Sequence, residues 1–161
     1  MEHVTIPVNK AKHFAEVCCT ANEMPEKEAR ILAEVLVETD MRGVMTHGLV
    51  RLPDYLERID LGVVTSSLNL EIQKDWVWGG VLNAGNGIGH VAAYKGMEWV
   101  INKAKDVGIG MATMRMSNHF GMAAYYSLMA AKQGMIGLVA SNSGPLMAPW
   151  GGKEVKVGNN P

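Results

Sequence analysis

The stretch VGIGMATMRMSNHFG at residues 107–121 decides the fold that this sequence predicts. Its first half, Val107–Met114, has the composition of a β-strand, and its second half is a polar turn that Ser117 or Asn118 can cap as a helix begins. His119 therefore lies near the carboxyl end of a strand, where open α/β sheets usually place ligands. Its ordinary pKa near 6.5 suits proton exchange, and a histidine hydrogen-bonded into the turn is the simpler alternative.

The flanking residues extend the same alternation of strands and helices. Strand-like runs at Leu70–Val77 and Met135–Ser141 stand on either side, and helical runs at Ile88–Ala104 and Met122–Lys132 separate the three strands. This order predicts an α/β region whose sheet contains parallel pairs.

The residues before this region have a helical pattern. We expect helices at Asn9–Ala21, after Pro25, and at Thr46–Leu61, with a linker at Val64–Leu68. The sequence thus predicts a helical N-terminal subdomain at 1–68 and an α/β domain at 69–161. A strand-like run, Lys153–Val157, has no closing helix after it, so we expect the second domain to be incomplete.

The net charge and the cysteine content limit the kinds of molecule that this protein is expected to bind. A formal charge of −1 over 161 residues gives no electrostatic reason to expect nucleic acid or an anionic membrane. The two cysteines, Cys18 and Cys19, are adjacent in a predicted helix, which suits neither a disulfide framework nor a zinc site and favours a reducing cytoplasm. No metal-spaced set of ligands is found in the sequence, and we predict no metal site.

The third predicted helix carries the first candidate site. If it is continuous, His47, Arg51 and Tyr55 lie one turn apart on one face. An arginine fork can hold a carboxylate through two parallel hydrogen bonds, and a histidine one turn away can move a proton on the adjacent oxygen. The pattern indicates a site for a 2-hydroxy or 2-keto acid, with a solvated helix face as the plain alternative.

Two further turns are weaker candidates. Ser141–Pro145 follows the third predicted strand and brings hydroxyl and amide groups to its carboxyl end. Gly85–His90 precedes a helix and superficially suggests a phosphate cradle, but it lacks the full dinucleotide-binding spacing. Each is also explained as an ordinary turn.

Taken together, three stretches resemble the type 2 malate/L-lactate dehydrogenase family, which also includes ureidoglycolate dehydrogenase, sulfolactate dehydrogenase and diketogulonate reductase. These stretches are RGVMTHGLVRLP at 42–53, SNHFG at 117–121 and SNSGPLMAPWGG at 141–152. The resemblance implies an NAD(P)-dependent oxidoreductase with a helical N-terminal region, a mixed α/β cofactor region that is not the standard Rossmann fold, and a homodimeric assembly.

The resemblance also implies roles for individual residues. His47 and His119 match the acid/base and active-site histidines, and Arg51 resembles the clamp on the substrate carboxylate. Thr46 and, from its place on the same predicted helix face, Tyr55 are expected as further substrate contacts. Thr46 stands where the family often has serine, so it keeps a hydroxyl. At the cofactor, the expected contacts are Ser143, Asn142 and His119.

The predicted function is hydride transfer between NAD or NADP and a small 2-hydroxy or 2-keto acid such as malate or lactate. His119 is the favoured proton donor over His47, and the identities of the acid and of the dinucleotide stay open. Family members are about twice this length, so we expect the chain alone to be impaired in catalysis. The alternative is a catalytically inactive binding or assembly module, which a natural stop codon would favour.

Overall fold

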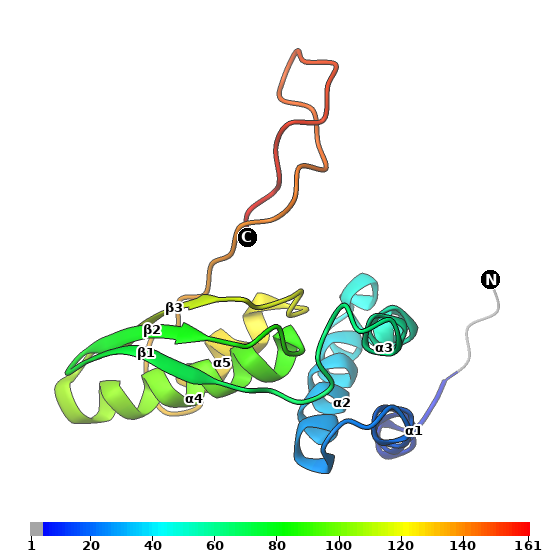
Figure 1. Ribbon diagram of the computed structural model, residues 1–161, viewed down its shortest axis with the longest axis horizontal. Coiled ribbons are helices and arrows are strands. Elements are labelled where there is room, and N and C mark those ends of the chain that lie inside the picture. The colour runs from blue at the N-terminus through cyan, green and yellow to red at the C-terminus, as the bar shows by residue number, and fades with distance from the viewer. Residues whose placement is uncertain (1–4) are drawn as a thin grey trace.

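The computed structural model describes residues 5–161 as a helical layer followed by a small α/β layer (Figure 1). The first layer holds α1 (Val8–Ala21), α2 (Glu26–Met41) and α3 (Leu52–Asp60), and α3 is preceded by the short turns η1 (Met45–His47) and η2 (Leu49–Arg51). Pro25 immediately precedes α2, and Glu26 and Glu28 lie in its first turn, where they complement the positive end of the helix dipole.

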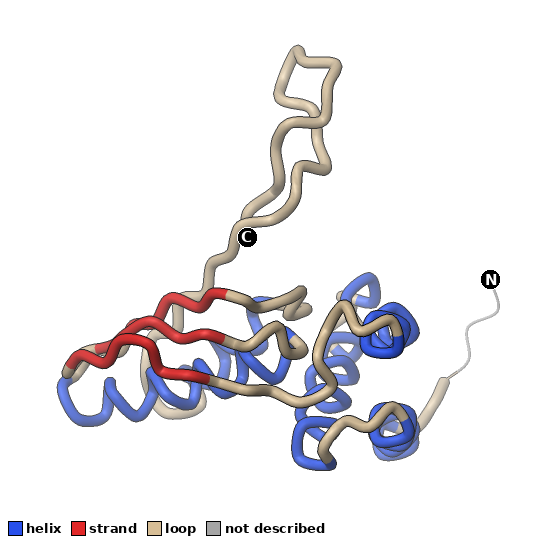
Figure 2. Tube along the Cα trace, viewed as in Figure 1, coloured by secondary structure: helices blue, strands red, loops and turns tan. Residues whose placement is uncertain are grey.

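The second layer is a three-stranded sheet backed by two helices. Its strands are β1 (Glu71–Trp76), β2 (Gly79–Asn83) and β3 (Met111–Arg115), in that spatial order among the described residues. β1 and β2 pair antiparallel, whereas β2 and β3 are parallel and are joined through α4 (Gly89–Val107). Both α4 and α5 (Ala123–Ala131) lie on the same side of the sheet (Figure 2). The predicted class, a helical region followed by a mixed α/β region without the standard Rossmann arrangement, is confirmed.

α2 carries the core of both layers. Leu32 and Leu36 of α2 pack in one cluster with Cys19 of α1, Tyr55 of α3 and Val91 of α4. On its other side, Val35 packs with Tyr125 and Tyr126 of α5. The division at residue 68 stays a prediction, since side chains from both sides of it share these clusters.

Three predicted elements differ from the structure. The third helix is not continuous, because the backbone leaves helical geometry at Gly48, and α3 begins only at Leu52 with Pro53 accommodated in its first turn. Met135–Ser141 forms no strand, and Lys153–Val157 contributes only an isolated bridge between Met147 and Val157. β2 was not predicted.

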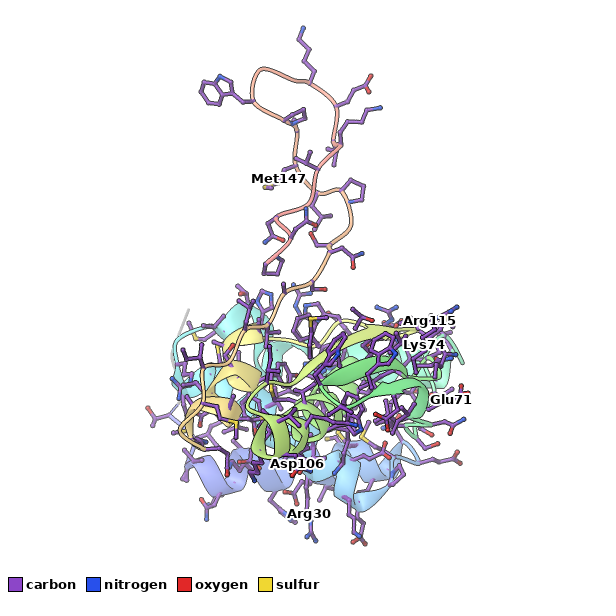
Figure 3. The ribbon with its side chains drawn as sticks, turned by 90° about the vertical axis from the view of Figure 1, so that its left-hand side faces the viewer. Arg30, Glu71, Lys74, Asp106, Arg115 and Met147 are labelled. Atoms are coloured by element: carbon purple, nitrogen blue, oxygen red, sulfur yellow. The ribbon has the colours of Figure 1, made fainter. Side chains whose placement is uncertain are left out.

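Residues after Ser141 form an arm that stands clear of the body (Figures 1 and 3). The arm closes on itself, since the Ser141 N–H donates to the Pro161 carbonyl and Met147 exchanges backbone hydrogen bonds with Val157. Trp150 and Leu146 on the arm, and Ile136 and Leu138 before it, are all at least 80% exposed. The arm therefore presents apolar side chains to solvent.

None of the helices among residues 5–161 has both the length and the hydropathy needed to cross a bilayer.

Candidate active site

The candidate active site lies where the loops after β2 and β3 meet. Parallel strands bring their carboxyl ends to one edge, and here the two loops are joined by hydrogen bonds from the Ala84 N–H to the Arg115 carbonyl and from the Asn86 N–H to the Met116 carbonyl. The Asn118 side-chain amide adds three bonds, donating to the backbone carbonyls of Asn86 and Gly87 and to the Asn86 side-chain oxygen at 3.0–3.2 Å. Asn118 thus ties the loops together and does not cap α5, which begins after Met122, contrary to the prediction for Ser117 or Asn118.

His119 extends from this junction toward α3. Its Nδ1 lies 2.7 Å from the hydroxyl oxygen of Tyr55, a residue 64 positions earlier. Burial raises the pKa of Tyr55 to about 12, so the phenol keeps its proton at neutral pH, and its hydroxyl oxygen accepts a hydrogen bond when Nδ1 carries a proton and donates one when Nδ1 is bare. His119 is exposed to solvent, so the rest of its imidazole is open to a ligand.

Two more imidazoles surround His119. The ring centroids of His47 and His90 lie 5.4 Å and 6.1 Å from that of His119. Burial first, and then the nearby charges of His47, Arg51 and Arg58, lower the pKa of His119 below its usual value. Charged His119 is therefore a stronger acid than a histidine in water.

Arg51 lies at the end of η2 with its side chain half exposed. Its Nε–H donates to the Thr46 carbonyl at 2.9 Å, and its Nη1 pairs with the Asp54 carboxylate at 3.1 Å. Thr46 in turn places its hydroxyl 2.9 Å from Nδ1 of His47. Arg51 thus already pairs with one exposed carboxylate, through a single nitrogen of its guanidinium group.

Asp40 anchors the loop that carries His47 and Arg51. Its carboxylate accepts a hydrogen bond from the Leu49 N–H at 3.0 Å and packs so closely on Gly48 that a Cβ there would overlap it. The glycine is therefore required for close approach, and the carboxylate fixes where η1 ends and η2 begins.

The structure brings together Thr46, His47, Arg51, Tyr55 and His119, which the sequence predicts at the substrate end of the site. It does so through a bent segment that packs on α2, not through one continuous helical face. A cavity of about 10 Å³, the size of one water molecule, lies beside Tyr55, Asn118 and His119.

Asn142 and Ser143, predicted to contact a cofactor, lie on the arm. The Ser143 N–H donates to the Asn160 side-chain oxygen at 2.9 Å, and the Ser143 hydroxyl donates to the Asn159 side-chain oxygen at 3.1 Å. Among residues 5–161, these two side chains have no hydrogen bond to either histidine of the substrate end. Their contact with a cofactor stays a prediction.

Sequence reasoning missed His90, Asp40 and the loop-joining role of Asn118. His90 ends the Gly85–His90 stretch, which the sequence indicates only as a weak phosphate cradle and which forms the turn before α4. Its position in a polar turn at the start of a predicted helix was the available signal. Within residues 5–161, no group of three histidine, cysteine or acidic side chains is arranged to hold a metal ion.

The chain is similar to known proteins along almost its whole length. The profile of the malate/L-lactate dehydrogenase family matches residues 6–161. Malate/(S)-sulfolactate dehydrogenase from Methanothermus fervidus is 45% identical over 136 residues, which cover 84% of this chain and 40% of that protein. Ureidoglycolate dehydrogenase (NAD(+)) from Escherichia coli K12 is 35% identical over 138 residues, covering 86% of this chain and 40% of that protein.

The fold agrees with a solved relative along nearly the whole chain. Sulfolactate dehydrogenase from Methanocaldococcus jannaschii superposes with a TM-score of 0.94 at 37% identity, covering 98% of this chain and 46% of that one. The chain therefore spans less than half the length of the relatives it matches. A profile match over almost every residue, together with relatives well above 30% identity, shows that this chain belongs to the malate/L-lactate dehydrogenase family.

Proposed function

We propose that this chain supplies the acid-binding and proton-transfer part of an NAD- or NADP-dependent 2-hydroxyacid dehydrogenase. The observation that carries the proposal is the 2.7 Å contact between the Tyr55 hydroxyl and Nδ1 of the exposed His119, with Arg51 on the segment that leads into α3. Relatives named malate, sulfolactate and ureidoglycolate dehydrogenases support an oxidoreductase of small hydroxy acids.

Arg51 binds the substrate carboxylate in this proposal. Its side chain is 50% exposed and is held at Nε by the Thr46 carbonyl, so the guanidinium is oriented before substrate arrives. The Asp54 carboxylate, itself more than half exposed, gives way to the substrate carboxylate or shares the fork with it. A bidentate contact would set the distance from the carboxylate to the neighbouring carbonyl carbon.

His119 handles the proton. In the reducing direction, Nε2–H of the imidazolium gives its proton to the oxygen of the former carbonyl, while Nδ1–H donates to the Tyr55 hydroxyl and the ring is left neutral with Nε2 bare. In the oxidising direction, the neutral ring takes the hydroxyl proton back at Nε2. His47, half-buried and paired with the Thr46 hydroxyl, is the second candidate for the same step.

When bound, the nicotinamide would supply or accept the hydride at the carbon next to the carboxylate. The name of the E. coli relative records NAD(+), and the choice between NAD and NADP for this chain is part of the proposal. Asn142 and Ser143 are the proposed contacts from the arm. We further propose a homodimer in the cytoplasm, the compartment that the unpaired Cys18 and Cys19 suit.

In our proposal, dehydrogenase activity needs parts of the family fold that lie outside these 161 residues. The matched relatives are more than twice as long, and Ile136, Leu138 and Trp150 expose apolar surface that a complete fold would bury. We therefore expect turnover only when the remaining part of the family fold is present in the same or a second chain.

The test starts with the natively expressed protein. Its intact mass is measured, and oxidation of NADH and NADPH is followed with pyruvate, oxaloacetate and related 2-keto acids. A mass near twice 17.5 kDa with turnover supports the proposal. A mass of 17.5 kDa with neither turnover nor nucleotide binding favours the alternative, a binding or assembly module.

Arg51→Lys in the active protein tests the carboxylate clamp. Losing one of two parallel charge-assisted bonds should raise KM for the keto acid by about 10- to 100-fold. Arg30→Lys is the matched control, since Arg30 is exposed on α2 and pairs only loosely with Glu26 at 4.0 Å. Equal kinetics for the two variants would remove Arg51 from the assignment.

A further inference from the structure

His90 is the one ring around His119 to which the proposed function gives no role. It lies in the first turn of α4, is 0% exposed, and faces Tyr55 of α3 and His119 of the β3–α5 loop. The centroids of His90 and Tyr55 are 4.8 Å apart with the rings at 71°, an edge-to-face contact. The buried ring therefore touches the residue whose hydroxyl engages His119.

Neither ring nitrogen of His90 has a hydrogen-bond partner among residues 5–161. A buried polar atom without a partner costs free energy, whereas an apolar side chain of similar shape would avoid that cost. The backbone at Gly121 lies close to Nε2 of His90, since a Cβ at position 121 would be 2.7 Å from that nitrogen. Gly121 also has φ of +74°, so both its backbone angle and its closeness to His90 favour glycine in the turn that carries His119.

The ring is neutral in these surroundings. Burial, followed by the nearby charges of His119 and His47, lowers the pKa of His90 to about 3. The titratable groups that face it are His119, His47 and Tyr55, and the two imidazoles disfavour a positive charge on His90. His90 thus acts through its shape and ring edge, not as a proton carrier.

We propose that His90 is a positioning residue, whose edge-to-face contact with the Tyr55 ring keeps the Tyr55 hydroxyl on Nδ1 of His119. This inference deepens the proposed function and names the group that fixes the tautomer of the proton donor. An aromatic edge against an aromatic face has a defined geometry, which restricts how far the phenol can turn away.

The test uses NMR of the 161-residue chain and so needs no turnover. The ¹⁵N shifts of His119 report how its proton divides between Nδ1 and Nε2. Tyr55→Phe, which removes the hydroxyl, gives the reference for a lost contact. His90→Ala should move the His119 shifts toward those of Tyr55→Phe and raise its titration midpoint toward pH 6.5, because water reaches the ring.

His90→Phe is the rescue variant. It keeps a flat ring edge against Tyr55 without the nitrogens, so the His119 shifts should stay near those of the unmodified chain. Unchanged shifts in His90→Ala would overturn the inference, as would equal displacement in His90→Phe with the fold intact. If His90→Ala does not fold, the inference is tested by His90→Phe and Gly121→Ala. The Cβ of Gly121→Ala would crowd Nε2 of His90, so this variant should displace the His90 ring and move the His119 shifts. An inactive complete enzyme with these NMR results intact would count against the proposed function alone.

Discussion

Asp40 and Leu49 are joined by a 3.0 Å hydrogen bond from the Leu49 backbone N–H to the Asp40 carboxylate, across nine residues of chain. This bond connects the end of α2 to the segment that carries His47 and Arg51. The placement of the predicted carboxylate clamp therefore depends on a side chain that does not belong to the clamp.

Asp40→Ala should lower the free energy of unfolding by about 1–3 kcal/mol, because it leaves a partly buried N–H without its acceptor. Asp40→Asn should cost less, since the amide oxygen can still accept the bond. Urea unfolding followed by circular dichroism measures both. Asp106→Ala, at an exposed position near the end of α4, is the control and should stay within about 0.5 kcal/mol.

Gly48→Ala should also destabilise the chain, because its Cβ would overlap the Asp40 carboxylate. The same substitution should cost less in the Asp40→Ala background, where the obstructing atoms are gone. A double-mutant cycle measures this coupling. Additive effects of the two substitutions would show that the close contact between Gly48 and Asp40 does not limit the loop.

His90 should make the chain sensitive to acid. Its folded pKa of about 3 is below the unfolded value near 6.5, so above pH 6.5 neither state carries the proton and the residue has no effect. As the pH falls from 6.5 toward 3, only the unfolded state gains a proton, and the free energy of unfolding drops by about 1.4 kcal/mol per pH unit.

The matched variant for this prediction is His90→Phe, which cannot titrate at that position. Urea midpoints measured between pH 7 and pH 4 should fall more steeply in the unmodified chain than in His90→Phe. Carboxylate titration affects both proteins alike, so parallel curves would show that His90 takes up its proton while the protein is folded.

Tyr126 should support the turn that follows His119. Its hydroxyl donates to the Phe120 carbonyl at 2.5 Å from a ring that is 1% exposed. Tyr126→Phe should cost about 1–2 kcal/mol in urea unfolding, since the carbonyl loses its partner. Tyr125→Phe is the control from the same apolar cluster, and a cost as large as that of Tyr126→Phe would contradict the assignment.

In the complete enzyme, kcat/KM for keto acid reduction should fall as the pH rises through the pKa of His119, because reduction needs the imidazolium. Burial and the nearby positive charges place that midpoint below the usual histidine value of 6.5. Oxidation of the hydroxy acid should show the opposite slope. A pH profile that survives His119→Ala would transfer the role to another group, with His47 the first to examine.

Local sequence signals predict the elements that depend on local chemistry. Pro25 and the acids after it indicate the start of α2, and apolar periodicity indicates α4 and α5 close to their observed bounds. β2 escaped prediction because it begins with Gly79 and Gly80 and is too buried to alternate. Two adjacent glycines predict a turn, and the segment becomes a strand only because it pairs with β1 and β3.

The other differences between prediction and structure depend on contacts between residues far apart in the sequence, which a local pattern does not contain. Met135–Ser141 has strand composition, but a strand needs a neighbouring edge, and none of residues 5–161 pairs with it in a ladder. The site shows the same limit. His119 is identifiable from its turn, whereas its contact with Tyr55 joins residues 64 positions apart and follows only from the packing of α3.

The three hydrogen bonds that Asn118 donates to the turn at Asn86 and Gly87 have a consequence for changing this protein. The orientation of His119 therefore depends on a turn about thirty residues earlier in the chain. An attempt to change the proposed substrate preference should therefore randomise that turn as well as the proposed substrate contacts, because a shift of the Asn86 carbonyl would turn the imidazole without replacing it.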